Sequence, residues 1–337
     1  MQINEFDYKL PLELIAQNPL EKRDDARLMV LDRINKSIEH KKISDLPGIL
    51  NPNTVLFFNN TLVFPARLYG EISQKKVEIL LHQEKSPGKW ECLVRPGKRF
   101  RVGTKISWPE LEGTVIEINE DGSRLIEFSL CGANFTRKID AIGQVPLPPY
   151  IKKSTSRPDQ YQTIYAQKRG SVAAPTAGLH FTPDLMKKLT EKGIDQFYAT
   201  LHVGRGTFEP VKVKKIEDHQ MHHEWFQLSV KTAEQLNLAK KKNKKIFAVG
   251  TTSARILESC AKNQQVKAKT GTTNLFIFPG YKFQFIDGLL TNFHLPKSTL
   301  LMLVSALVGK EFIKEAYQEA IRQKYRFFSF GDAMLIK

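Results

Sequence analysis

The segment GSVAAPTAGLHFT, residues 170–182, is the stretch around which we interpret the rest of the chain. Its only ionisable side chain is His180, and its small residues let a backbone approach a ligand closely. A helix start follows, because Thr182 is a preferred capping residue, Pro183 suits the first helical position and Asp184 favours the positive helix end. We therefore expect a close-approach loop that brings an imidazole to a helix N-terminus. From these residues alone, a tight buried connection with a hydrogen-bonded histidine is the alternative.

The pattern of expected secondary structure changes twice before this segment, near residue 66 and at residues 144–150. The first 65 residues contain apolar strands, such as 55–58, in a pattern typical of an α/β domain. From about residue 66 to 143 there are only short β-rich segments without a helical segment, and Asp121-Gly122 predicts a hairpin turn. The α/β texture returns after the proline-rich exit at 144–150. We therefore predict an α/β protein with a discontinuous α/β main domain, residues 1–65 and 150–337, and an inserted small all-β barrel domain, residues 66–149.

Length and charge limit the class of protein. At 337 residues, two domains are the default, and a hydrophobic fraction of 41% with 26% charged residues fits a globular protein with a core. Lys plus Arg minus Asp plus Glu is 51 − 35, a net charge of +16. An excess of this size favours a polyanionic partner such as nucleic acid over a generally lysine-rich surface.

The cysteines and the chain start indicate where the protein works. Cys92, Cys131 and Cys260 are far apart and show no paired metal-ligand spacing, so reduced thiols are expected. Residues 1–7 lack the basic start and apolar run of a secretory signal, and the apolar run 300–308 is far shorter than a membrane span. We expect a cytoplasmic protein.

Small polar residues and histidines follow several of the apolar strands. Asn59 follows the strand 55–58, and a Gly-Thr-Thr-Ser turn at 250–253 follows another strand and starts a helix. Loops of this kind build ligand sites at the strand ends of α/β folds, and a helix start is a ready anion site. A role as simple helix caps is the alternative for the Thr and Ser residues. Together these segments favour a loop-built site.

The absence of several known catalytic motifs argues against the chemistries that depend on them. His222, His223 and Glu224 are adjacent, but there is no HExxH and no third ligand at a familiar spacing, so no metal is expected. The chain lacks the GxSxG motif of serine hydrolases and the GxxxxGK[ST] motif of phosphoryl transfer. Residues 202–207 contain GxG without a third glycine, so the dinucleotide-binding fingerprint is missing as well. Acid–base chemistry by His and Glu fits best.

Six long segments, together with the chain start, resemble one family. The chain is similar throughout to the S-adenosylmethionine:tRNA ribosyltransferase-isomerases of queuosine biosynthesis. The resemblance lies in residues 170–182, 202–208, 221–224, 249–253, 291–299 and 331–334, with 14–17, 23–28 and 65–68 near the start.

The resemblance implies a reaction and its substrates. Such an enzyme transfers and isomerises the ribosyl moiety of S-adenosylmethionine onto 7-aminomethyl-7-deazaguanine at the tRNA wobble position. It gives epoxyqueuosine-tRNA, with adenine and methionine released. The resemblance also implies no permanently bound cofactor, no metal, and an α/β domain interrupted by a small β-barrel. No membrane partner is expected, because the chain lacks an apolar run long enough to span a membrane. We expect a monomer.

Site roles follow from this reaction as hypotheses. A proton must leave either the carbon next to the sulfonium or the aminomethyl ammonium, and a second group must protonate the departing adenine. The candidate bases are Glu224, His180, His202 and His222, and the candidate acids are Asp332 and His294. Thr251, Thr252 and Ser253 are candidates to hold a carboxylate or phosphate, Asn59 and Asn292 to read a base edge, and Phe181, Phe208 or Phe293 to stack on a base. The other expected binding residues are Thr176, Gly178, Gly204, Gly206, Thr207, Gly250 and Arg255.

Three positions depart from the family pattern. Asn60 stands where Asp is typical, Leu62 where a basic residue is usual, and Arg205 where an apolar or small residue is more common. Arg205 is open to two interpretations, as a phosphate contact or as a solvated surface residue.

Two other functions compete with this one. A methyltransferase would use the same sulfonium substrate, but it usually needs a glycine-rich loop that this chain lacks. A basic RNA-binding protein without chemistry would explain the charge of +16 but not the His, Gly and Asn residues at the strand ends.

Overall fold

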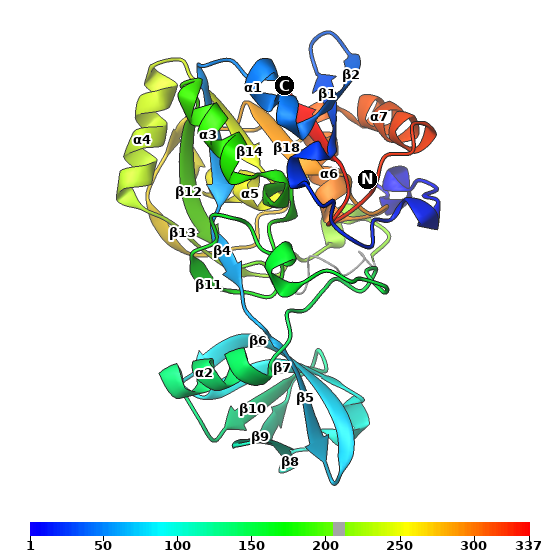
Figure 1. Ribbon diagram of the computed structural model, residues 1–337, viewed down its shortest axis with the longest axis vertical. Coiled ribbons are helices and arrows are strands. Elements are labelled where there is room, and N and C mark those ends of the chain that lie inside the picture. The colour runs from blue at the N-terminus through cyan, green and yellow to red at the C-terminus, as the bar shows by residue number, and fades with distance from the viewer. Residues whose placement is uncertain (205–212) are drawn as a thin grey trace. The chain divides into compact units, whose positions relative to one another are not determined.

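The computed structural model describes residues 1–204 and 213–337. They form two compact units, each with its own core. The first comprises Met1–Leu62, Pro148–Lys168 and Ala174–Lys337, and the second Val63–Leu147 and Arg169–Ala173. Figure 1 shows a mixed α/β sheet in the first unit and a barrel in the second, so the predicted fold class is confirmed. The domain limits expected from the sequence stay a prediction.

A nine-stranded sheet, in the order β17-β13-β12-β3-β14-β18-β19-β1-β2, organises the first unit. Its central strands β12, β3, β14 and β18 run parallel to one another. Its strands are β1 (Arg27–Asp32), β2 (Ser37–Lys42), β3 (Thr54–Asn59), β12 (Asp195–Leu201), β13 (Glu224–Leu228), β14 (Lys245–Val249), β17 (Lys269–Thr273), β18 (Gly288–Asn292) and β19 (Ala333–Ile336).

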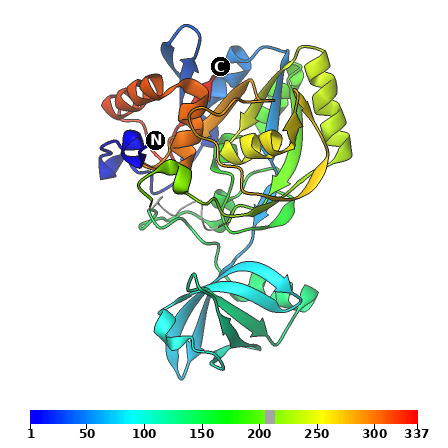
Figure 2. The ribbon, with the colours of Figure 1, turned by 180° about the vertical axis from the view of Figure 1, so that it is seen from behind.

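Helices cover both faces of this sheet, which explains the continuous apolar runs of its central strands. Every residue of β3 and β18 is buried, as expected for parallel strands packed on two sides. Helices α1 and α3 lie toward the viewer in Figure 1, and α5 and α6 in Figure 2. The helices of this unit are α1 (Leu46–Ile49), α3 (Pro183–Glu191), α4 (Val230–Lys241), α5 (Thr251–Cys260), α6 (Thr299–Val308) and α7 (Lys310–Arg322).

The helix start predicted at Thr182 is confirmed, and capping residues also set the limits of a second helix. The Thr182 hydroxyl accepts a hydrogen bond from the Leu185 N–H at the start of α3. Ser298 caps α6 in the same way, and Gly309, with a φ of 93°, ends it. Local capping chemistry therefore sets these boundaries.

The second unit is a closed barrel of six antiparallel strands in the order β10-β7-β6-β5-β8-β9. The Asp121-Gly122 turn joins β9 to β10, as predicted. The expectation of no helical segment is wrong, because α2 (Gly132–Ile142) packs Phe135 and Ile139 into the barrel core. The strands are β5 (Arg67–Ile72), β6 (Lys75–Ser86), β7 (Lys89–Arg95), β8 (Lys105–Trp108), β9 (Leu111–Ile118) and β10 (Arg124–Phe128).

Short elements complete the described chain. A two-stranded sheet pairs β4 (Thr61–Val63) with β11 (Lys168–Ser171), and a second pairs β15 (Ala261–Lys262) with β16 (Gln265–Val266). The 3-10 turns include η1 (Ile3–Phe6) and η7 (Thr176–His180). Within residues 1–204 and 213–337, every helix is too short or too polar to cross a membrane.

Candidate active site

A cavity in the first unit lies where the parallel strands β14 and β18 end. The strands lead directly into Gly250 and into the segment 293–295, and both line the cavity. The segment 174–177, which belongs to the stretch 170–182, forms another part of the wall. The space inside is about 70 Å³, enough for about two water molecules, and it opens to solvent. A ligand of nucleoside size needs more room, so we expect binding to displace lining side chains.

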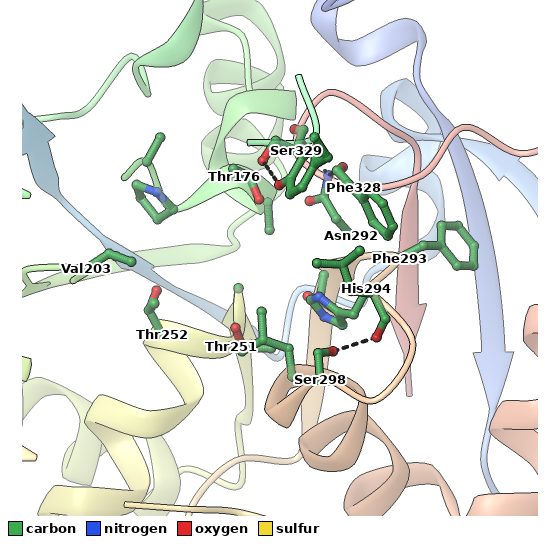
Figure 3. A pocket seen from close by; sticks show the side chains of 18 residues that line it. Thr176, Val203, Thr251, Thr252, Asn292, Phe293, His294, Ser298, Phe328 and Ser329 are labelled. Carbon is green, nitrogen blue, oxygen red and sulfur yellow. Dashed lines mark hydrogen bonds between the residues drawn. The ribbon is translucent and has the colours of Figure 1, made fainter. Parts of the chain in front are cut away.

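Six of the predicted site residues line this cavity, and Figure 3 shows five of them, all but Gly250, around one hollow. They come from three separate parts of the chain, as a loop-built site requires. They are Thr176, Gly250, Thr251, Thr252, Asn292 and His294.

The start of α5 supplies the threonines. Gly250 has a φ of 86°, a conformation that a side chain rarely adopts, and this lets the chain turn directly from β14 into α5. The Thr252 hydroxyl accepts a hydrogen bond from Asn59 Nδ2 at 3.2 Å, so Asn59 supports the wall from behind without lining it. The hydroxyls of Thr176 and Thr251 have no protein partner among the described residues, so both are available to a ligand.

The end of β18 supplies Asn292 and His294. The Asn292 amide donates to the Phe328 carbonyl at 2.8 Å, and its Oδ1 is buried without a partner among the described residues. His294 Nε2 lies 3.0 Å from the Thr291 hydroxyl. Phe293, a predicted stacking residue, also borders the cavity, but its ring points away from the cavity and packs on Tyr317 and other aromatic rings, so the ring offers no stacking surface.

Sequence reasoning missed five polar or aromatic lining residues, Tyr150, Thr291, Ser298, Phe328 and Ser329. The hydroxyls of Tyr150 and Ser329 are hydrogen-bonded at 2.6 Å, and the rings of Tyr150 and Phe328 lie 4.9 Å apart. Phe328 has a φ of 68°, unusual for a bulky residue and a sign of local strain. Thr291 and Ser298 belong to the segment 291–299 that carries the family resemblance, whereas Tyr150 is marked in the sequence only by its place at the end of the proline-rich exit.

His180, Gly178 and Phe181 lie beside the cavity rather than in its wall. His180 lines a second, smaller cavity of about 20 Å³, and Ser329 borders both cavities. Phe181 is fully buried with its ring 5.0 Å from that of Phe58. A Cβ on Gly178 would lie 1.9 Å from Tyr165 Oη, so this glycine makes room for a protein side chain.

Glu224 and Arg255 form a buried ion pair outside the cavity lining. Both side chains are 6% exposed, and the second carboxylate oxygen of Glu224 accepts the Gly204 N–H at 3.0 Å. His202 Nδ1 lies 2.8 Å from the Thr61 hydroxyl, and its ring stacks on Trp225 at 4.8 Å. The structure brings these residues together as a cluster near the end of β12.

The remaining predicted residues are dispersed. Asp332 is buried and accepts the backbone N–H groups of Arg27 and Arg326, the Ser253 hydroxyl donates to the Val249 carbonyl, and His222 is exposed. Asn60 accepts a hydrogen bond from Thr200 at 2.7 Å. Gly206, Thr207, Phe208 and Arg205 lie outside the described residues.

Burial keeps the imidazoles of the region neutral. It lowers the pKa of His294 to about 3, of His180 to about 4 and of His202 to about 4. It also raises the pKa of the Asp332 carboxyl above its ordinary value. Neutral imidazoles of such low pKa are weak bases, but they can donate or accept a hydrogen bond. Within the described chain, no group of three His, Cys, Asp or Glu side chains is placed to hold a metal ion.

The comparisons with known proteins cover the whole chain. Residues 3–336 match the model of a family described as queuosine biosynthesis protein. A protein of Clostridium kluyveri named S-adenosylmethionine:tRNA ribosyltransferase-isomerase is 50% identical, with all of both chains covered. A protein of Halothermothrix orenii with the same name is 51% identical, again over all of both chains.

A solved structure is also similar. It is the crystal structure of S-adenosylmethionine tRNA ribosyltransferase from Thermotoga maritima, with 39% sequence identity and a TM-score of 0.58. The match covers 99% of this chain and 100% of that one. These agreements extend over both units and confirm the resemblance drawn from the motifs. The chain belongs to the queuosine biosynthesis protein family.

Proposed function

We propose that this chain is an S-adenosylmethionine:tRNA ribosyltransferase-isomerase. Its substrates are S-adenosylmethionine and a tRNA that carries 7-aminomethyl-7-deazaguanine at the wobble position. The ribosyl group loses its bonds to the methionine sulfur and the adenine nitrogen and gains a bond to the amino nitrogen of the modified base. At the same time the two carbons that lost these bonds join to close a carbon ring, and the ribose ring oxygen moves from one of them to the other to form the epoxide. One proton leaves the carbon next to the sulfur and one leaves the ammonium; the departing adenine takes up one, and the other is released. The products are epoxyqueuosine-tRNA, adenine and methionine. The observation that carries the proposal is the 50% identity over the full length of a relative with this name.

The cavity lined by Thr176, Thr251, Asn292 and His294 is where we place the reaction. Its wall combines uncharged hydroxyl, amide and imidazole groups with the Tyr150 and Phe328 rings, a mixture suited to a nucleoside. Among the residues that the structure describes, the lining carries no carboxylate or ammonium group. The charge changes of the reaction would therefore be met by hydrogen bonds and by groups that move on binding.

The identity of the acid and the base stays a hypothesis. Glu224 is an expected base, but in this structure both of its oxygens are occupied, by Arg255 and by the Gly204 N–H. It could act only after this pairing changes. His294 is the expected acid that lines the cavity, and its low pKa means that it would take up a proton only transiently. Uncharged donors such as the Thr251 hydroxyl could stabilise the departing adenine in its place.

Three further expectations belong to this proposal. S-Adenosylmethionine serves as a consumed substrate, and we expect no permanent cofactor or metal. We expect the protein to act as a monomer, which light scattering of the purified protein would test. We also expect it to work in the cytoplasm, where its tRNA substrate is found.

Chromatography after mixing the protein with S-adenosylmethionine and the aminomethyl-deazaguanine tRNA tests the function. The proposal predicts free adenine and methionine in equal amounts and a tRNA that gains the ribosyl mass. S-Adenosylhomocysteine instead would identify a methyltransferase and overturn the proposal. Salt-dependent tRNA binding with no adenine release would support an RNA-binding protein without this chemistry.

A further inference from the structure

The segment 150–155 leaves the cavity with two lysines next to each other. Tyr150 lines the cavity, and Lys152 and Lys153 follow two and three residues later. The Cα atom of Lys152 is therefore at most about 7 Å from that of Tyr150. Both lysine side chains are exposed, and neither ammonium has a hydrogen-bond or ion-pair partner within the part of the chain that the structure describes. Two uncompensated positive charges thus stand beside the cavity.

Gln17 holds the backbone of these lysines in place. Its Nε2 donates to the Tyr150 carbonyl at 3.1 Å, and its Oε1 accepts the N–H groups of Lys152 at 2.8 Å and Lys153 at 3.3 Å. The segment has no helix or strand of its own, so these side-chain bonds satisfy backbone groups that secondary structure would otherwise pair. The neighbouring Asn18 extends the contact by accepting the Thr155 N–H at 2.8 Å.

The segment 14–18, whose residues Gln17 and Asn18 hold the backbone of the segment 150–155, also contacts the turn at 326–329 in the cavity wall. We call the Gln17 contacts the brace. The Ala16 N–H donates to the Phe327 carbonyl at 3.2 Å, and the Arg326 guanidinium donates to the Asn18 carbonyl. The turn that follows Phe327 carries Ser329, which bonds Tyr150. Three segments therefore support one another: residues 14–18, the turn at 326–329 and the start of the segment 150–155. This arrangement fixes the backbone while it leaves the two lysine side chains free to reach outward.

We propose that Lys152 and Lys153, held by Gln17 at the rim of the cavity, bind backbone phosphates of the tRNA next to the wobble nucleotide. Flexible ammonium groups on a fixed backbone suit phosphates, which offer charge but no base-specific pattern. The net charge of +16 agrees with an anionic partner of this kind. The inference rests on the proposed function for the identity of the RNA, and it adds two residues that bind the phosphates of this RNA.

The test compares the double variant K152A/K153A with K241A/K242A, which removes two exposed lysines at the end of α4, outside the cavity lining. Binding of an anticodon stem-loop that carries the modified base is measured at several salt concentrations. Two lost contacts to single-stranded RNA should reduce the slope of log Kd against log salt by about 1.4. They should also raise the KM for tRNA roughly tenfold, with the KM for S-adenosylmethionine unchanged.

A third variant separates charge from positioning. Gln17→Ala keeps both charges but removes the brace, so it should raise the KM for tRNA while the salt slope stays near that of the wild type. Equal slopes and KM values for K152A/K153A and K241A/K242A would overturn the proposal. So would a rise in the KM for S-adenosylmethionine alone, because the lysines would then serve that substrate. Absence of adenine release by the wild type would instead refute the proposed function, and the salt slope would still decide whether these lysines contact RNA.

Discussion

At the scale of single residues, the buried histidines link the candidate site to stability. The folded pKa of His294 is about 3 and that of His180 about 4, against an ordinary value of 6.5. As the pH falls below 6.5, the unfolded chain binds protons that the folded chain does not, so the free energy of unfolding decreases. The full contribution of these groups is present above pH 6.5 and is lost progressively as the pH falls to about 4 for His180 and about 3 for His294.

We therefore predict that the Tm falls between pH 7 and pH 5, before most carboxyl groups titrate. Thermal unfolding followed at half-unit pH steps provides the measurement. The variant His294→Gln should show a smaller fall over this range, whereas His223→Gln, at an exposed position, should behave like the wild type. A Tm that is flat or rises on acidification would contradict the neutral state of these imidazoles.

The pair Glu224–Arg255 gives a second prediction at this scale. Removing one partner of a buried ion pair leaves the other charge uncompensated, so Glu224→Ala should reduce the free energy of unfolding by about 3–5 kcal/mol. Denaturant titration against the exposed control Glu234→Ala measures this loss. If Glu224→Ala kept its stability and lost all turnover, Glu224 would be a proton carrier in the reaction and its ion pair would be secondary.

At the scale of elements, the turn η7 depends on a close contact that the sequence does not reveal. Gly178 is a predicted binding residue, yet the space beside it is filled by Tyr165. Gly178→Ala should destabilise the protein by about 1–3 kcal/mol through overpacking. Gly48→Ala in α1 is the matched control, because a Cβ there has nothing within 4 Å. Equal stabilities of the two variants would show that the turn adapts without cost.

Local signals predicted the elements better than they predicted the site. Thr182 and Ser298 mark helix starts because a capping bond involves only neighbours in sequence. The sequence also led to the strand ends and to six lining residues. It missed Tyr150 and Ser329, which meet across 179 positions of sequence. Sequence reasoning missed α2 as well, because Phe135 and Ile139 stabilise this helix by packing into the barrel core, a contact with residues distant in sequence.

At the scale of the whole molecule, each compact unit has its own hydrophobic core. If the units are independent folding domains, as the sequence predicts, a core mutation should affect only one of them. Ile126→Ala in the barrel should lower one calorimetric transition and leave the other unchanged, and Ile256→Ala in the first unit should do the reverse. Both side chains are fully buried. A single transition that shifts as a whole in both variants would show one cooperative fold.

The measurement that tests the central claim most directly is the kcat/KM for S-adenosylmethionine of the double variant T176V/T251V. Valine keeps the shape of threonine but removes the two hydroxyls that line the cavity without a partner among the described residues. The matched control T270V/T272V makes the same change at exposed positions of β17. If the cavity is where the ribosyl transfer occurs, T176V/T251V should lose roughly tenfold or more in kcat/KM, with its Tm unchanged. Equal kcat/KM values for the two double variants would show that the reaction takes place elsewhere.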